Sequence, residues 1–187
     1  MIFYFAFDRL NKGIAEGDEK MKKIAVLLGV FWVCGVWAAE NEILGSFDNW
    51  SAHSYSDGTE HVCYMASQPI KSQGKYARRD DVYLIVTHRP NSKSFDVVNV
   101  VAGYTYKSTS KPQLTIDKNK AVELKRYEDT AWAKDAETDA KLVSQMQKGS
   151  QAVLLGTSAR GTKTTDTFSL KGFSKAYEAI NKACGRE

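Results

Sequence analysis

The chain has 187 residues, of which 26 are Lys or Arg and 22 are Asp or Glu, so its formal net charge is +4. With 43% hydrophobic residues, it is too apolar and too evenly charged to be a disordered protein. So small a charge gives little electrostatic basis for nucleic acid as the main partner, and three cysteines are too few for a disulfide-rich miniprotein.

A secretory signal peptide is predicted at residues 21–39. It begins with Met-Lys-Lys, continues with an apolar run over residues 24–37 and ends in small residues. The run of 14 residues (24 to 37) is shorter than the roughly 20 that a membrane-spanning helix needs. We therefore expect cleavage after Ala38 or Ala39 and no transmembrane span in the mature chain.

The segment before the signal, residues 1–20, is interpreted as an extension from a start codon chosen too far upstream. The alternative is a long basic region of the signal itself. Removing residues 1–39 leaves 148 residues (40 to 187) with a charge of +3 (21 minus 18). This length predicts a single domain with one core over residues 40–187.

The first part of this domain alternates in the manner of β-strands, and strands are expected at residues 50–55 and 61–67. A basic segment follows Pro69 and contains Lys71, Lys75, Tyr76, Arg78 and Arg79. Two aspartates come directly after it and partly neutralise it. A solvated loop is the preferred interpretation, with contact to an anionic envelope polymer or to phospholipid head groups as the alternative.

The most strand-like segments are residues 82–87 and 95–101, which are rich in β-branched and aromatic side chains. The turn residues between them, Arg89 to Lys93, predict a hairpin. Further strands are expected at residues 113–116, 121–125, 152–157 and 164–170.

One short motif between these strands resembles a catalytic signature. Ser108 and Lys111 match S-x-x-K, in which one helical turn brings a lysine under a nucleophilic serine. Pro112 disfavours helical backbone angles at Lys111, so the turn is not expected to form. No catalytic residue is predicted.

Two segments change to helical spacing. Between Asp135 and Lys148 apolar residues recur every three or four positions, with Asp135 as N-cap and Gly149 at the end. From Ser174 a second helix is predicted, whose buried stripe consists of Phe173, Tyr177, Ile180 and Cys184. Strands without βαβ alternation and two helices predict a mainly β fold, an antiparallel β-sandwich with two appended α-helices.

Asp166 is the carboxylate with the most unusual position. Alternation places it on the same strand face as Phe168 and Leu170, so it is expected to be buried and to need a partner. Arg160 or Lys163, across the preceding loop, or backbone amides could serve.

The cysteines predict one specific bond. Cys34 leaves with the signal, and the remaining Cys63 and Cys184 are expected to form a disulfide in an oxidising compartment. His61 lies on the same strand face as Cys63, and the two could form half of a zinc site, but only if that cysteine were reduced. No pair of histidines has metal-ligand spacing, so no metal and no cofactor is predicted.

The mature chain resembles the invasion associated locus B family of bacterial exported proteins. The similarity is carried by residues 50–52 (WSA), 63–69 (CYMASQP), 142–149 (LVSQMQKG), 156–162 (GTSARGT) and 165–173 (TDTFSLKGF), and by a last helix that ends in Cys184. It implies an immunoglobulin-like sandwich, a periplasmic or envelope-associated location, and a contribution to host-cell invasion in pathogens. It implies no catalytic residues. Within these motifs, structural roles are expected for Arg160, Gly161, Asp166, Gly172 and Phe173, with Arg160 pairing with Asp166.

Three functions remain open at this point. The first is a non-enzymatic envelope protein that binds an envelope or host protein or glycan, with peripheral membrane association possible and nucleic acid excluded. The second is a cell-wall hydrolase or transferase that uses Ser108 and Lys111. The third is a secreted factor that acts directly on host cells.

Overall fold

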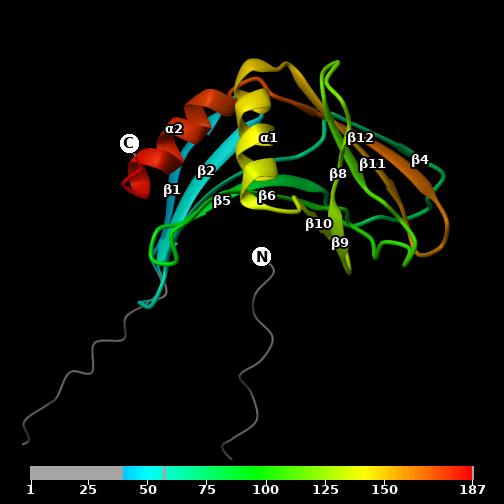
Figure 1. The fold of residues 1–187 in the computed structure, drawn as a ribbon, viewed down its shortest axis with the longest axis horizontal. Helices are drawn as coiled ribbons and strands as arrows, with labels where there is room; N and C mark the ends of the chain where they lie inside the picture. The colour runs from blue at the N-terminus through cyan, green and yellow to red at the C-terminus, as the bar shows by residue number, and fades with distance from the viewer. Residues whose placement is uncertain (1–39, 57, 187) are drawn as a thin grey trace, which may run out of the picture. The chain divides into compact units, whose positions relative to one another are not determined.

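The computed structural model describes residues 40–56 and 58–186, so the predicted extension, the signal peptide and Cys34 lie outside the described residues. The described part contains twelve β-strands and two α-helices (Figure 1). No helix in it is long and apolar enough to cross a membrane.

Seven antiparallel strands form the first sheet. In spatial order they are β1 (Glu40–Phe47), β2 (Trp50–Ser56), β3 (His61–Ser67), β5 (Tyr83–Arg89), β6 (Ser94–Val101), β10 (Thr130–Trp132) and β9 (Lys125–Tyr127). The second sheet has five antiparallel strands, ordered β4 (Lys71–Gly74), β12 (Lys163–Ser169), β11 (Gln151–Thr157), β7 (Gln113–Ile116) and β8 (Val122–Glu123).

The chain passes repeatedly between the two sheets, which is typical of a β-sandwich. It leaves the first sheet after β3, returns at β5, and leaves it again after β6. Buried side chains of both sheets and both helices form one hydrophobic core. The predicted mainly β fold with two antiparallel sheets and two helices is confirmed, and it is compatible with the immunoglobulin-like sandwich that the resemblance implies.

All eight predicted strands are present, although the segment predicted at residues 121–125 is divided between β8 and the start of β9. Strands β1, β4 and β10 and the rest of β9 were not predicted. The largest correction concerns β4, because Lys71–Gly74 pairs with β12 and is not part of a loop.

Helix α1 (Ala136–Lys148) begins as the sequence predicts. The Asp135 carboxylate accepts a hydrogen bond from the Thr138 amide at 2.9 Å, which satisfies one of the unpaired amides of the first turn. Of the apolar residues that recur at helical spacing, Leu142, Val143 and Met146 are buried but Ala140 is exposed, and the buried face also includes Asp139. Asp139 Oδ1 accepts a hydrogen bond from the Val98 amide at 2.8 Å and so ties α1 to β6.

Helix α2 (Phe173–Ala183) lies against β1, β2 and β3 (Figure 1). The predicted stripe is confirmed, because Phe173, Tyr177, Ile180 and Cys184 are all buried. Phe173 meets the buried Trp50 ring edge to face, with 4.9 Å between ring centroids.

The predicted disulfide is present. Cys63 in β3 and Cys184 at the end of α2 are bonded, with an S–S distance of 2.05 Å and a sequence separation of 121 residues. The bond attaches the end of the last helix to the middle of the first sheet.

Gly172 allows the chain to turn from β12 into α2. Its φ is +91°, and a Cβ atom built on it would lie 1.9 Å from the carbonyl oxygen of Phe47. Both the backbone angle and the lack of space therefore require glycine. Gly161, in the β11–β12 hairpin, has a similar φ of +84°, but a Cβ atom there would meet no other atom within 4 Å.

This pair gives a matched prediction. Gly172→Ala should lower the free energy of unfolding by more than about 2 kcal/mol, because the left-handed strain of roughly 1–2 kcal/mol is joined by a clash with backbone. Gly161→Ala should cost the strain alone. Denaturant unfolding of the two variants measures the difference, and equal losses would contradict the role given to the contact with Phe47.

Candidate functional site

The described part of the chain contains a cavity of about 530 Å³. Three connecting segments form it: residues 75–80 between β4 and β5, residues 103–105 between β6 and β7, and residues 158–164 around the β11–β12 turn. In the first two, residues 75–80 and 103–105, the chain passes between the sheets, and we call them the crossing segments. The cavity is therefore a consequence of the sandwich topology.

A close backbone approach holds the first two segments together. The Asp80 amide donates to the Gly103 carbonyl oxygen at 3.1 Å. Gly103 has a φ of +68°, and a Cβ atom there would lie 2.2 Å from the Asp80 carbonyl oxygen. Only glycine fits this contact.

A buried ion pair lies behind the cavity wall. The Arg79 guanidinium donates to both carboxylate oxygens of Asp166, each at 2.7 Å, and the two side chains are 5% and 0% exposed. Arg79 Nε also donates to the Ala102 carbonyl oxygen at 2.7 Å. Arg79 belongs to the first crossing segment, and its side chain thus connects β12 to the residue directly before the second one. The two parallel hydrogen bonds to Asp166 are the geometry in which Arg binds a carboxylate most strongly.

Two tyrosine rings face the same guanidinium. Its central carbon lies 4.8 Å from the centroid of the Tyr104 ring and 5.6 Å from that of Tyr76, within the range of a cation–π contact. The Tyr104 hydroxyl is hydrogen-bonded to Thr164 Oγ1 at 2.7 Å. Gly156 makes room for it, because a Cβ atom there would lie 2.3 Å from the Tyr104 oxygen.

Burial and charge shift the titration of these groups. Burial alone would lower the pKa of Arg79, but the hydrogen bonds and charge of Asp166 outweigh it and raise the pKa. Burial raises the pKa of Tyr104, and more strongly that of Tyr106, whose hydroxyl is buried without a hydrogen-bond partner. At neutral pH, therefore, Arg79 is charged and both tyrosines are neutral.

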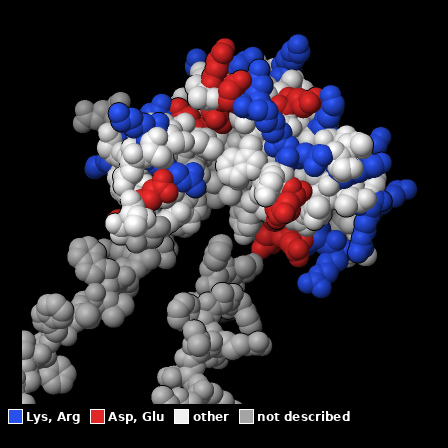
Figure 2. Space-filling model, turned by 60° about the horizontal axis from the view of Figure 1, so that its bottom comes forward, with Lys and Arg blue, Asp and Glu red and all other residues white. Residues whose placement is uncertain are grey.

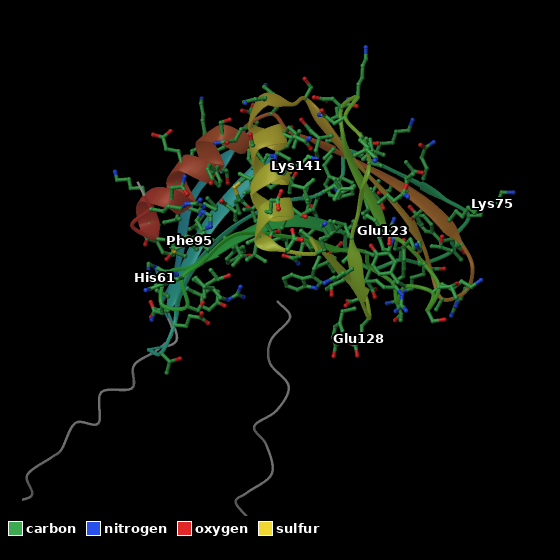
Figure 3. All side chains as sticks on the ribbon, in the orientation of Figure 1. His61, Lys75, Phe95, Glu123, Glu128 and Lys141 are labelled. Carbon is green, nitrogen blue, oxygen red and sulfur yellow. A yellow bond between two sulfur atoms is a disulfide. The ribbon has the colours of Figure 1, made fainter. Side chains whose placement is uncertain are left out.

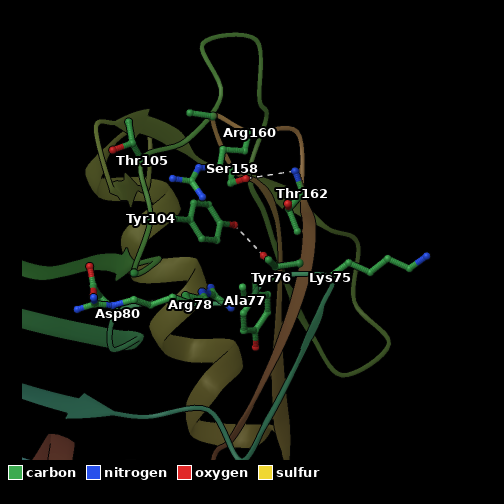
Figure 4. Close-up of a pocket in the computed structure, with 14 residues that line it drawn as sticks. Lys75, Tyr76, Ala77, Arg78, Asp80, Tyr104, Thr105, Ser158, Arg160 and Thr162 are labelled. Atoms are coloured by element: carbon green, nitrogen blue, oxygen red, sulfur yellow. Dashed lines mark hydrogen bonds between the residues drawn. The ribbon is translucent and has the colours of Figure 1, made fainter.

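The rim of the cavity is basic. Lys75, Arg78 and Arg160 line it and are exposed, and none of the three forms an ion pair with a described residue. Figure 4 shows Arg160 extending toward the Tyr104 side of the cavity, whereas Lys75 extends away from it. In the face drawn in Figure 2, basic side chains gather at the right-hand end, where Figure 1 places β4, β11 and β12.

These contacts correct two predictions. Asp166 is buried as predicted, but its partner is Arg79, and neither Arg160 nor Lys163 bonds to it. Arg79 in turn is not a solvated loop residue. Of the motif residues, Arg160 lines the cavity, Gly161 shapes the adjacent turn, and Gly172 and Phe173 serve the start of α2 at a separate place.

The S-x-x-K residues do not form a catalytic pair. Ser108 lies in a turn that the Ser110 amide closes on the Lys107 carbonyl oxygen at 2.8 Å, so the helical turn is absent. Lys111 Nζ lies 3.5 Å from Glu123 Oε2, and both side chains are largely exposed. Neither Ser108 nor Lys111 lines the cavity described above.

The possible half zinc site lies far from the cavity, since Figure 3 shows His61 and Lys75 at opposite ends. The nitrogen and sulfur atoms of His61, Cys63 and Cys184 lie within 4.8 Å of one another. The disulfide occupies both sulfur atoms, so only His61 is available as a ligand.

A second buried polar cluster anchors α2 near the disulfide. His88 is fully buried, accepts a hydrogen bond from the Asp96 amide at Nδ1, and contacts Asn181 Oδ1 through Nε2 at 2.9 Å. The Tyr177 hydroxyl donates to Asp96 Oδ1 at 2.6 Å. Burial would raise the pKa of Asp96, but hydrogen bonds from Arg186 and Tyr177 outweigh it and lower the pKa. These groups are mutually satisfied, which indicates a structural role.

Comparison with known proteins gives one match. A family model described as "Invasion associated locus B (IalB) protein" matches residues 50–181, from the start of β2 into the last turns of α2. No curated protein and no solved structure matches the chain significantly. The matched residues include the ion pair, the cavity and Cys63.

Proposed function

Because the chain belongs to the invasion associated locus B family, we propose that it is an exported protein of the bacterial envelope that acts by binding rather than by catalysis. Its partner is a protein or glycan of the envelope or of the host cell, and its role is accessory, in host-cell invasion or in envelope function. The observation that carries the proposal is the cavity with its basic rim. Its exposed cations are available to a binding partner, and no described residue that lines it is an activated nucleophile.

The serines near or outside the cavity support this proposal. Ser158 is the serine that lines the cavity, and its Oγ accepts a hydrogen bond from the Thr162 amide at 3.2 Å. Activation of a serine needs a base within hydrogen-bond reach, such as a histidine. None of the histidines lines the cavity, and Lys111 is beside Glu123.

The predicted signal peptide and the disulfide support this location. A disulfide persists in the periplasm or outside the cell, and both cysteines of the described part are used in it. Fractionation of the bacteria tests the location. Mature protein in the periplasm or with the envelope supports the proposal, and mature protein found only in the culture medium favours the secreted factor that acts on host cells.

We expect the protein to be inert toward reagents for catalytic serines. A fluorophosphonate probe and a labelled penicillin should leave the purified protein unmodified, because no histidine or lysine of the described residues is placed to activate the Ser108 hydroxyl. Mass spectrometry measures the outcome. Stoichiometric labelling that disappears in Ser108→Ala would contradict the proposal and support a cell-wall hydrolase or transferase.

A further inference from the structure

We propose that the cavity between residues 75–80, 103–105 and 158–164 is a binding site for an acidic saccharide, a sugar of one or two rings that carries a carboxylate or a phosphate group. The inference rests on the proposed binding function and names the ligand chemistry of its site.

The charged residues of the cavity favour an anionic ligand. Arg79 is neutralised by Asp166, and the Lys75 side chain extends away from the cavity (Figure 4), so the cations left to interact with a ligand are Arg78 and Arg160. Asp80 is the one carboxylate among the lining residues. These two arginines form no ion pair with a described residue, so at the mouth of the cavity they can attract a carboxylate or phosphate and orient it, and Arg can bind either group through two parallel hydrogen bonds.

The uncharged residues that line the cavity favour a ligand with a ring and hydroxyl groups. Tyr76 and Tyr104 offer aromatic surface (Figure 4), and four hydroxyl-bearing residues lie among the others: Thr105, Ser158, Thr162 and Thr164, the last of which is bonded to the Tyr104 hydroxyl. A purely apolar ligand would make no hydrogen bond to these hydroxyls and no contact with the charge of the rim cations. A saccharide presents C–H faces to the tyrosines and hydroxyls to the polar side chains.

The volume of the cavity is larger than inorganic phosphate, the simplest candidate anion, would fill. A cavity of about 530 Å³ lies within the range of small-molecule sites, roughly 300–1,000 Å³. Inorganic phosphate would contact the rim cations but would leave the tyrosine wall uncovered. One or two sugar rings match the space better.

The site is also formed in advance. The Arg79–Asp166 pair and the Asp80–Gly103 contact fix the two crossing segments, and the Tyr104 hydroxyl is held by Thr164. The backbone of these segments therefore loses little conformational entropy on binding, which favours the capture of a small ligand.

The test is a titration of the exported protein, followed by NMR chemical shifts, with four probes: glucuronic acid, glucose 6-phosphate, glucose and inorganic phosphate. The variant Arg160→Gln removes a rim charge that makes no ion pair within the described chain, so folding is preserved. Lys182→Gln is the control, because it removes the same charge from an exposed position on α2.

We expect one or both acidic sugars to shift resonances of the cavity residues, and to bind more tightly than glucose or phosphate. Arg160→Gln should weaken the binding about tenfold or more, as expected for loss of a charged hydrogen bond of roughly 1.5–3 kcal/mol. Lys182→Gln should change it less than twofold.

Three results would overturn the inference: no shift with either acidic sugar, equal binding of glucose or phosphate, or equal effects of the two substitutions. Comparison of the two acidic sugars decides whether the recognised anion is a carboxylate, a phosphate or both. None of these results bears on whether the protein is exported or is unreactive toward serine probes, so failure here is distinguishable from failure of the proposed function.

Discussion

Loss of the Cys63–Cys184 disulfide is expected to lower the free energy of unfolding by about 3–5 kcal/mol. The bond closes a loop of 121 residues, so it restricts the unfolded chain strongly. Chain-entropy models give about 5 kcal/mol for such a loop, and measured values are often smaller. For a domain of this length the change corresponds to a fall of about 10–15 °C in melting temperature.

The folded state should survive this loss. Helix α2 is also held by the hydrogen bonds of Tyr177 to Asp96 and of His88 to Asn181, and by the packing of Phe173 on Trp50. These contacts do not depend on the covalent bond. We therefore expect the reduced protein to be folded at room temperature but to unfold at lower denaturant concentration.

Denaturant unfolding of the native protein with and without a thiol reductant measures the effect, with the buried Trp50 as fluorescence probe. The double variant Cys63→Ala/Cys184→Ala should match the reduced protein and should no longer respond to the reductant. An oxidised protein no more stable than the double variant would show that the bond contributes nothing to stability.

The strands that the sequence predicts are those whose side chains alternate between core and solvent, such as β12, where Asp166 and Phe168 are buried and Thr165 is only partly so. The strands that it misses lie at or near the sheet edges. All four residues of β4 and all three of β9 are exposed. Such strands form because their backbone pairs with a neighbour, and backbone pairing leaves no hydrophobic period in the sequence.

The candidate site was only partly predictable for a related reason. Burial of Asp166 follows from alternation, but its partner Arg79 is 87 residues away and belongs to a segment that looks solvated. Arg160 is close in sequence and was the natural expectation. The pairing depends on where the chain crosses between sheets, and no local pattern encodes that crossing.

Removal of the Asp166 carboxylate is expected to be as damaging as loss of the disulfide. In Asp166→Ala the Arg79 guanidinium keeps its charge in a site where its side chain is 5% exposed, and such an uncompensated buried charge costs about 3–5 kcal/mol. Asp166→Asn keeps the shape of the side chain but loses the negative charge, and it should cost nearly as much.

The exposed pair of Lys111 and Glu123 provides the control within the same sheet. Its side chains are 73% and 54% exposed and 3.5 Å apart. Solvent and salt screen such a pair, so Glu123→Ala should change the free energy of unfolding by less than about 1 kcal/mol. Denaturant unfolding of the two alanine variants compares a buried ion pair with a surface one on the same scaffold.

A double variant separates the cost of a lone charge from the value of the pair. Replacing both partners, as in Arg79→Met/Asp166→Leu, removes both buried charges and should recover much of the stability that Asp166→Ala loses. The Tyr104 ring would then lose the cation that it faces at 4.8 Å, and the wall of the cavity would lose its rigid support. We therefore expect a stable protein with weakened saccharide binding. A double variant as unstable as Asp166→Ala would show that the pair stabilises the fold through its hydrogen bonds, including that of Arg79 to Ala102, and not merely by mutual neutralisation.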